Sequence, residues 1–173
     1  MRPIYVQQDH GVFTALPVKA KYGSKKDYIT LVKTGYIIFE FIKRSQSNFD
    51  QAKPVFDWQN KQYFTLDPKR ALEILNLDLK NRPQVNLTFE NLHEENNKKK
   101  LNIRSVEGKN SFVVSFEKVS AGEAKLASAN NVSLGEMLLI QKMIDYSVPY
   151  MMGWQVMGTG KVAEEDLVFQ NSN

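Results

Sequence analysis

The sequence contains no cysteine and only two histidines among its 173 residues. The lack of cysteine excludes disulfides, cysteine-ligated zinc, iron–sulfur clusters and thiol catalysis. His10 and His93 do not form the i,i+4 pair of a helical metal site, so no histidine-based metal centre is expected. The sequence also lacks a phosphate-binding loop and a nucleophile elbow. We therefore expect no metal, no cofactor and no enzymatic activity.

Long hydrophobic runs are absent as well. The most apolar stretch, residues 134–157, contains Glu136, Gln141, Lys142 and Asp145, which are too polar for a membrane span. The first eight residues lack the apolar segment of a secretion signal. Apolar residues make up 42% and aromatic residues 11% of the chain, so a globular core is expected, in an intracellular or organellar protein.

The charge is distributed unevenly along the chain. The net charge is +4, but residues 1–118 contain 20 basic and 13 acidic side chains, and residues 119–173 contain 3 and 6. The first segment therefore has a net charge of +7 and the second a net charge of −3. This asymmetry indicates a polyanionic partner for the first segment and a different task for the second.

Alternation of apolar and polar residues predicts β-strands in the first two thirds of the chain. The expected strands are residues 4–18, 28–32, 35–44, 85–92, 99–106 and 112–118. The segments that show no alternation, residues 45–53, 94–97 and 120–131, are expected to be loops.

Residues 55–58 and 61–66 flank Gln59-Asn60, which predicts a hairpin with a two-residue turn. One face of this hairpin suits a core, and the other carries aromatic rings and a cation, which suit stacked bases and their phosphates. The expected core residues are Val55, Phe64 and Leu66, and the expected binding residues are Phe56, Trp58, Lys61 and Tyr63, with Tyr36 of the preceding strand. The alternative is that Phe56 and Trp58 fill a second core layer.

Basic residues on the predicted strands give a second indication of a nucleic-acid partner. Lysines near the N-terminus, together with basic side chains on one side of a later strand and in the turn after it, could line a groove for a single strand. The alternative is a solvated strand surface. The expected phosphate-binding residues are Lys33, Lys98, Lys100, Arg104 and Lys109, and the N-terminal cluster also includes Lys19, Lys21, Lys25 and Lys26 around Tyr22 and Tyr28.

Two helices are predicted from their start signals. Asp67 and Pro68 form an N-cap and first helical position for a helix over residues 69–75. The capping box from Ser133 to Glu136 opens a longer helix. The order of strands, short helix, strands and long helix predicts an α+β domain over residues 1–160 with two repeat-like halves, residues 4–76 and 80–157, and an acidic, flexible tail over residues 161–173.

The long C-terminal helix is apolar around nearly its whole circumference. Such a helix must be buried on several sides, which favours contact with another subunit. The alternative is complete burial within the monomer. Pro149 is expected to kink or end the first part of the helix. The residues expected at the subunit contact are Leu138, Met143, Pro149, Met151, Met152 and Trp154.

Three segments, which follow one another along the chain in the same order as in the family, resemble the Whirly family. Residues 56–66 (FDWQNKQYFTL) are similar to the family's Asp-Trp, two variable residues and Lys-Gln that lead into a strand and a short helix. Residues 148–154 (VPYMMGW) resemble its Leu-Pro-Tyr, apolar pair and Gly-Trp near the end of the last helix. Residues 35–41 (GYIIFEF) are similar to its Gly-Phe-Val-Leu-Leu-Gln-Phe strand.

The resemblance implies two four-stranded antiparallel sheets packed roughly perpendicular to each other, each followed by a helix. Four subunits would assemble around their helices. It also implies binding of single-stranded DNA in mitochondria or plastids with little sequence preference, or of RNA, as in the related guide-RNA-binding mitochondrial proteins. The processes implied are organellar DNA maintenance, with repair and transcription regulation, or RNA metabolism.

One departure from the family pattern concerns an early strand. The family's Lys-Gly-Lys-Ala-Ala-Leu corresponds here to residues 11–16 (GVFTAL), where both lysines are missing unless His10 replaces the first. A diverged member or an RNA-binding relative is therefore expected. The leading hypothesis is a sequence-tolerant binder of single-stranded nucleic acid. The alternative is a structural docking subunit of an organellar ribonucleoprotein.

Overall fold

The computed structural model describes residues 3–8, 11–25, 28–45, 55–81, 84–92, 97–120, 123–154, 162 and 166–167. Ten strands and two helices occur in this part of the chain. The first half contains β1 (Ile4–Gln8), β2 (Gly11–Val18), β3 (Lys21–Lys25), β4 (Tyr28–Lys33), β5 (Tyr36–Lys43), β6 (Gln62–Leu66) and α1 (Pro68–Leu75). The second half contains β7 (Asn86–Leu92), β8 (Asn97–Ser105), β9 (Ser111–Ser120), β10 (Glu123–Ser133) and α2 (Leu134–Met152).

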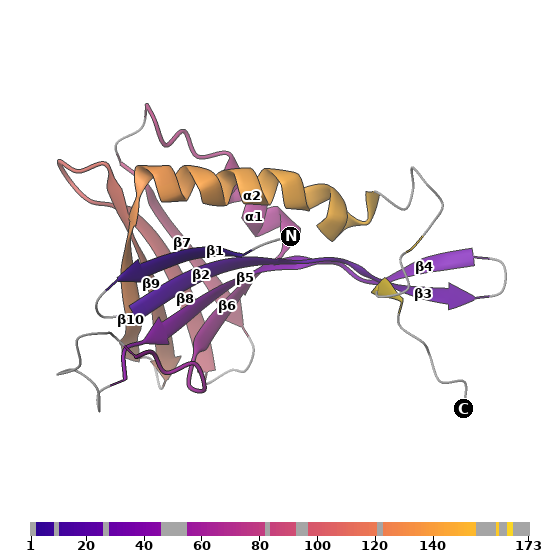
Figure 1. Ribbon diagram of the computed structural model, residues 1–173, viewed down its shortest axis with the longest axis horizontal. Helices are drawn as coiled ribbons and strands as arrows, with labels where there is room; N and C mark the ends of the chain where they lie inside the picture. Colours follow the sequence, from indigo (N-terminus) through magenta and orange to yellow (C-terminus); the bar gives the residue numbers. More distant parts are fainter. Residues whose placement is uncertain are drawn as a thin grey trace.

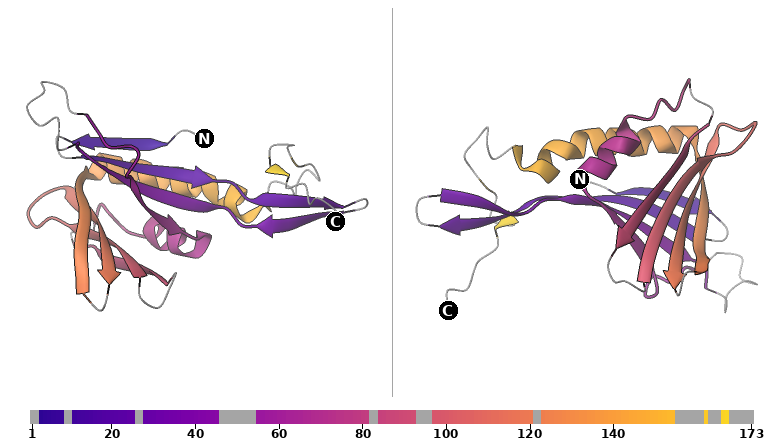
Figure 2. Two further views of the ribbon diagram at one scale, coloured as in Figure 1. Left: turned by 90° about the horizontal axis from the view of Figure 1, so that it is seen from below. Right: turned by 180° about the vertical axis from the view of Figure 1, so that it is seen from behind.

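The strands form two four-stranded antiparallel sheets, with the orders β1-β2-β5-β6 and β10-β9-β8-β7. Each sheet is followed by a helix, and Figure 2 shows the strands of the two sheets crossing one another. The predicted α+β fold is therefore confirmed. Strands β3 and β4 pair only with each other and continue β2 and β5 beyond the end of α2 as a protruding hairpin, called the arm below (Figure 1).

The core lies between the two sheets, where the apolar face of one meets the apolar face of the other. Alternation places Ile37, Phe39 and Phe41 of β5 on the inner face, and all three are buried. Phe41 stacks on Phe116 of β9 with the ring centroids 5.7 Å apart, which joins the sheets. Phe13 of β2 packs against both Phe39 and Phe41. The outer faces of the two sheets consequently point to opposite sides of the molecule.

The predicted hairpin over residues 55–66 is wrong, although its turn is present. Strand β6 pairs with β5 and not with the residues before the turn. Those residues pair with the end of β5 instead, since Asp57 N donates to Lys43 O at 2.9 Å. Residues 58–61 therefore form an outward bulge in one interrupted edge strand, and bulges of this kind redirect side chains. Val55, expected in the core, is exposed.

The loop predicted over residues 120–131 is also wrong, because most of it belongs to β10. This strand pairs with β9 along its length, with a register shift between Leu126 and Ser128. Its sequence, EAKLASANNVS, contains few β-branched or aromatic residues and shows no clear alternation. Pairing with a strongly alternating neighbour decides its conformation, because β-propensity depends on cross-strand context.

Both predicted helix starts are confirmed. The Asp67 side chain accepts a hydrogen bond from Arg70 N at 2.9 Å at the start of α1. At the start of α2, Ser133 Oγ accepts from Glu136 N at 3.3 Å and the Glu136 carboxylate accepts from Ser133 N at 2.8 Å. These contacts satisfy N–H groups that have no partner within the helix.

A side chain from α2 caps the end of α1. The last carbonyls of a helix lack partners within it. The buried Gln141 side chain supplies hydrogen-bond donors there. Its Nε2 donates to the carbonyls of Ile74 and Leu75 at the end of α1, at 2.9 and 3.3 Å, and to the carbonyl of Leu77 just beyond the helix, at 2.8 Å. The two helices are therefore joined by hydrogen bonds as well as by apolar packing.

Of the two effects expected of Pro149, a kink or an end of the first part of the helix, the second does not occur. The helix continues through Pro149 to Met152 and ends at Gly153, which adopts a left-handed conformation with φ of 75°. The Gly153 N–H donates to the Pro149 carbonyl, as in a common glycine C-cap.

Backbone groups at the base of the arm cap the last carbonyls of α2. Ala20 N donates to Tyr150 O at 3.1 Å, and Gly35 N donates to Met151 O at 2.9 Å. The helix end therefore touches the backbone on both sides of the arm, and Gly35 permits this close approach because it has no Cβ. A Cβ at this position would lie only 2.7 Å from the Met151 Cα.

The predicted solvated tail is wrong at Asp166, which is buried. Its carboxylate lies 3.4 Å from Lys19 Nζ and 3.8 Å from Lys21 Nζ, and Leu167 forms a bridge with Tyr22 of β3. Tyr22 is itself buried, and burial together with the nearby carboxylate raises its pKa. Lys19 and Lys21, two of the lysines expected around Tyr22, therefore contact the tail. Apart from residues 162 and 166–167, the predicted tail lies outside the described residues.

Candidate nucleic-acid interface

The outer face of the first sheet carries exposed aromatic side chains. A row of directly opposite residues crosses all four strands and consists of Tyr5, Thr14, Glu40 and Tyr63. Tyr5 and Tyr63 stand at the two ends of the row and are 60% and 51% exposed. Exposed rings on a sheet are surfaces on which unstacked bases can lie. The pattern identified Tyr63 but not Tyr5, whose strand was only weakly indicated.

Two lysines lie over tyrosine rings on this face. Lys33 Nζ is 5.2 Å from the centroid of the Tyr36 ring, and Lys99 Nζ is 4.3 Å from that of Tyr63. Both distances are within the range of cation–π interactions. The structure thus brings Lys33, Tyr36 and Tyr63, three of the expected binding residues, onto one surface. Lys99 was missed because alternation assigned it to the apolar side of its strand, with Leu101.

Trp58 lies on the bulge beside this face and is 49% exposed, whereas Phe56 is half-buried. The bulge is held by Asp57, whose carboxylate accepts hydrogen bonds from Asn60 Nδ2 at 2.8 Å and from Asn60 N at 3.1 Å. These hydrogen bonds lower the pKa of the Asp57 carboxyl. Lys61 follows directly and contacts Glu40 in the row. The alternative in which Phe56 and Trp58 fill a second core layer is therefore wrong for Trp58.

The predicted basic residues of β8 lie on the opposite side of the molecule. Lys98, Lys100 and Arg104 belong to the outer face of the second sheet, where Lys100 Nζ is 2.8 Å from the Glu90 carboxylate. This hydrogen bond lowers the pKa of Glu90 and raises that of Lys100. Arg104 is exposed, as is Lys109 in the following turn. These residues do not share a surface with the tyrosines of the first sheet.

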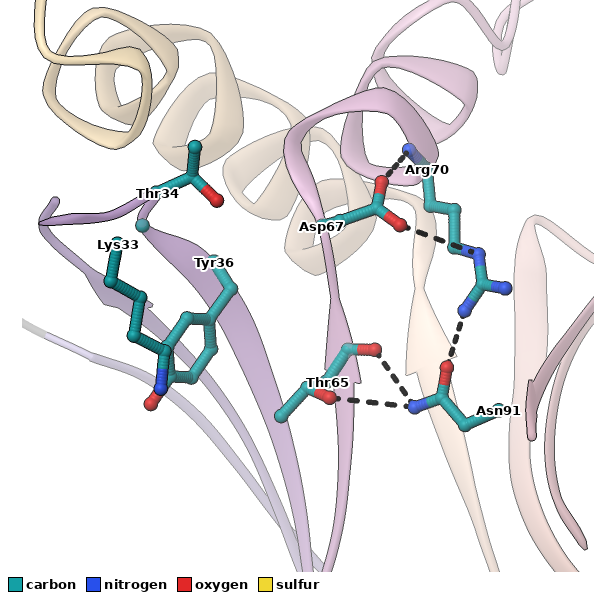
Figure 3. Close-up of a pocket in the computed structure, with 8 residues that line it drawn as sticks. Lys33, Thr34, Tyr36, Thr65, Asp67, Arg70 and Asn91 are labelled. Atoms are coloured by element: carbon teal, nitrogen blue, oxygen red, sulfur yellow. Dashed lines mark hydrogen bonds and ion pairs between the residues drawn. The ribbon is translucent and has the colours of Figure 1, made fainter. Parts of the chain in front are cut away.

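A cleft of about 590 Å³ adjoins the aromatic face (Figure 3). Figure 3 shows Lys33 and Tyr36 on one side and Thr65, Arg70 and Asn91 on the other. Arg70 donates to the side chain of Asn91, and Asn91 Nδ2 donates to Thr65 O at 3.1 Å. This network fixes the far wall. The complete lining is Lys33, Thr34, Gly35, Tyr36, Thr65, Asp67, Arg70 and Asn91.

A second open surface lies on α2. Leu139, Tyr146 and Trp154 are all more than half exposed, and the rings of Tyr146 and Tyr150 lie 5.6 Å apart. Of the residues predicted at a subunit contact, Leu138, Met143, Pro149 and Met152 are half-buried. The prediction for Met151 is wrong, because its side chain is fully buried within the chain. Because the helix is apolar around nearly its whole circumference, its sequence pattern could not identify which apolar side chains face the sheet.

A further expectation concerns the early strand, where both lysines of the family pattern are missing. Phe13, at the position of the second missing lysine, is fully buried in the core. A lysine could not replace it without burying a charge. His10 lies outside the described residues.

Among the residues that the structure describes, no group of three or more potential ligands is placed to hold a metal ion. Neither helix in this part of the chain is both long and apolar enough to span a membrane.

The crossed sheets, their following helices and an open aromatic face define an α+β protein with a sheet surface available for a ligand. The family model for the Whirly transcription factor matches residues 6–143. The chain therefore belongs to the Whirly family.

Solved structures agree with this assignment at the level of the fold. WHY1 from Arabidopsis thaliana is similar with a TM-score of 0.77 and 14% identity, over 92% of this chain and 89% of that one. WHY3 from Arabidopsis thaliana gives 0.74 and 12%, over 92% and 94%. The plant transcriptional regulator PBF-2 gives 0.71 and 13%, over 92% and 86%. Comparison with curated proteins gives no match.

Proposed function

We propose that this protein binds single-stranded DNA or RNA through the outer face of the first sheet and has no enzymatic activity. The observation that carries the proposal is the grouping of Tyr36 and Tyr63 with Lys33 and Lys99, each lysine beside a ring. Rings would stack bases, and ammonium groups would neutralise the adjoining phosphates. Trp58 on the bulge would extend the stacking surface.

The family supports a role in organellar DNA maintenance or RNA metabolism. PBF-2, a plant transcriptional regulator, shares the fold. We therefore propose a mitochondrial or plastid protein that acts on exposed single strands during transcription, repair or RNA processing. Arg104 and Lys109 would provide a second, weaker contact for strands long enough to reach the other sheet.

A salt titration of fluorescence anisotropy tests the binding proposal. Labelled single strands of mixed sequence should bind more tightly than the matching duplex, because stacking requires unpaired bases. Each phosphate neutralised by Lys33 or Lys99 adds about −0.7 to the slope of log K against log salt, so a slope of roughly −1.4 is expected.

Variants locate the interface in the same assay. Lys33→Ala combined with Lys99→Ala should reduce both affinity and slope, whereas Arg104→Ala combined with Lys109→Ala should change little on short strands. The reverse result would move the interface to the second sheet. Equal affinity for duplex, or binding that does not respond to salt, would overturn the proposal altogether.

We also propose that the exposed face of α2 binds other copies of the chain, in a homotetramer. Leu139, Tyr146 and Trp154 form the open apolar part of this face. Light scattering should give about four times the chain mass of 19.9 kDa. Leu139→Glu with Tyr146→Glu should yield monomers, and Leu126→Glu, at an equally exposed leucine on β10, should not. A mass unchanged by the α2 variants would exclude this surface.

The alternative function, a docking subunit of an organellar ribonucleoprotein, is favoured by a different observation. The arm exposes Ile29, Leu31 and Val32, which are apolar side chains on a protruding hairpin. A wild-type monomer in light scattering would indicate that another protein covers these residues and the α2 face.

A further inference from the structure

Glu40 lies in the middle of the proposed binding face, where a negative charge would repel a polyanion. Its cross-strand neighbours are Thr14 and Tyr63, and Tyr5 lies beyond Thr14. The Glu40 side chain is only 14% exposed. A carboxylate held at the centre of such a surface calls for an explanation in terms of what it binds.

Two hydrogen bonds fix the Glu40 carboxylate. Thr14 Oγ1 donates to Oε2 at 3.1 Å, and Lys61 Nζ donates to Oε1 at 2.6 Å. Each carboxylate oxygen can accept two hydrogen bonds, so each retains one acceptor site. The Lys61 ammonium has three N–H donors, of which this contact uses one, and its side chain is 43% exposed.

The remaining hydrogen-bonding groups form an ordered set. Lys61 Nζ offers a donor, and beside it Glu40 Oε1 and Oε2 each offer an acceptor. The complementary edge is acceptor, donor, donor. Guanine presents this order on its Watson–Crick edge through O6, N1–H and the N2 amino group, and the other bases do not. Cytosine offers one donor and two acceptors, uracil and thymine place an acceptor opposite Oε2, and adenine lacks the second donor. Single-stranded bases are read on this edge.

We propose that Glu40 and Lys61 form a guanine subsite on the outer face of the first sheet. This inference rests on the proposed function, and it adds a preference at one nucleotide to an otherwise sequence-tolerant surface. Tyr5 and Tyr63 lie three strand spacings apart, roughly 14 Å, on either side of Glu40. They would stack the neighbouring bases and hold the central base over the carboxylate.

The test compares oligothymidine strands that differ at one central position. A strand with one guanine should bind the wild-type protein about tenfold more tightly than strands with adenine, cytosine or thymine there, as for a good bidentate base contact. Hypoxanthine keeps O6 and N1–H but lacks the N2 amino group, so it should lose much of this advantage. An analogue that lacks only N7 should retain it.

Variants assign the preference to the carboxylate. Glu40→Gln replaces one acceptor by a donor and should remove the difference between the guanine and thymine strands. Glu90→Gln is the matched control, because Glu90 is also paired with a lysine, Lys100, but on the other sheet. It should leave the guanine preference intact.

The outcomes separate this inference from the proposed function. If no single strand binds, the proposed function fails. If all strands bind equally, or if hypoxanthine equals guanine, the guanine subsite fails and the binding proposal stands. A guanine preference that persists in Glu40→Gln would also overturn the subsite. Thermal unfolding monitored by circular dichroism confirms that both variants are folded, and the base analogues test the subsite without any variant.

Discussion

Replacing Tyr36 and Tyr63 together by alanine should weaken the binding of single strands by at least about 30-fold. Each base stacked on an aromatic side chain contributes about 1–3 kcal/mol, and two such losses add when the rings do not touch. Both side chains lie on the outer face, away from the core, so their loss should leave the fold intact. Anisotropy with labelled strands measures the effect.

The corresponding pair of phenylalanine variants is the control. Tyr36→Phe with Tyr63→Phe keeps the rings and should keep most of the affinity, because stacking does not need the hydroxyl groups. If the phenylalanine pair were as weak as the alanine pair, the hydroxyls rather than the rings would bind the ligand. If neither pair weakened binding, this face would not be the interface.

Gly35→Ala should lower the free energy of unfolding by about 3 kcal/mol or more, at the upper end of the cost of overpacking. An added Cβ would lie 2.2 Å from Val18 O, 2.7 Å from Met151 Cα and 2.9 Å from Lys19 C, all of them backbone atoms that cannot turn aside. Relief would require separating the base of the arm from the end of α2, which would also break the Gly35–Met151 hydrogen bond. Urea denaturation measures the loss.

Gly135→Ala provides the matched control. A Cβ at Gly135 meets nothing within 4 Å, and the residue lies in the first turn of α2. Alanine there should stabilise the protein by up to about 1 kcal/mol, because glycine is a poor helix former. Equal effects of the two substitutions would show that the close contact at Gly35 does not constrain the fold.

Strong local signals made most of the fold predictable. Alternation in β5 and β8 and the caps at Asp67 and Ser133 are short-range patterns with direct physical causes, and the structure agrees with them. β10 could not be predicted, because its alanines, serines and asparagines become a strand through pairing with β9. The hairpin failed for a similar reason, since a good turn does not determine which strand pairs with which.

The candidate site was predictable only in part. The sequence indicated which side of a strand is polar, and it thereby identified Tyr36, Tyr63 and Lys61. It could not show that the outer face of β8 lies on the other side of the molecule, because that depends on how the sheets pack. Ion pairs between distant segments, such as Lys100 with Glu90, were equally hidden. Lys99 and Tyr5 join the site through the tertiary fold alone.

The two helix ends are each completed by the other half of the chain. Gln141 of α2 closes α1, and the backbone of Ala20 and Gly35 closes α2. During synthesis on the ribosome, the end of α1 would therefore lack the Gln141 hydrogen bonds until residue 141 has left the exit tunnel. We expect the nascent first half to remain without stable structure until then, so that the two halves of the chain reach their native state in a single cooperative step.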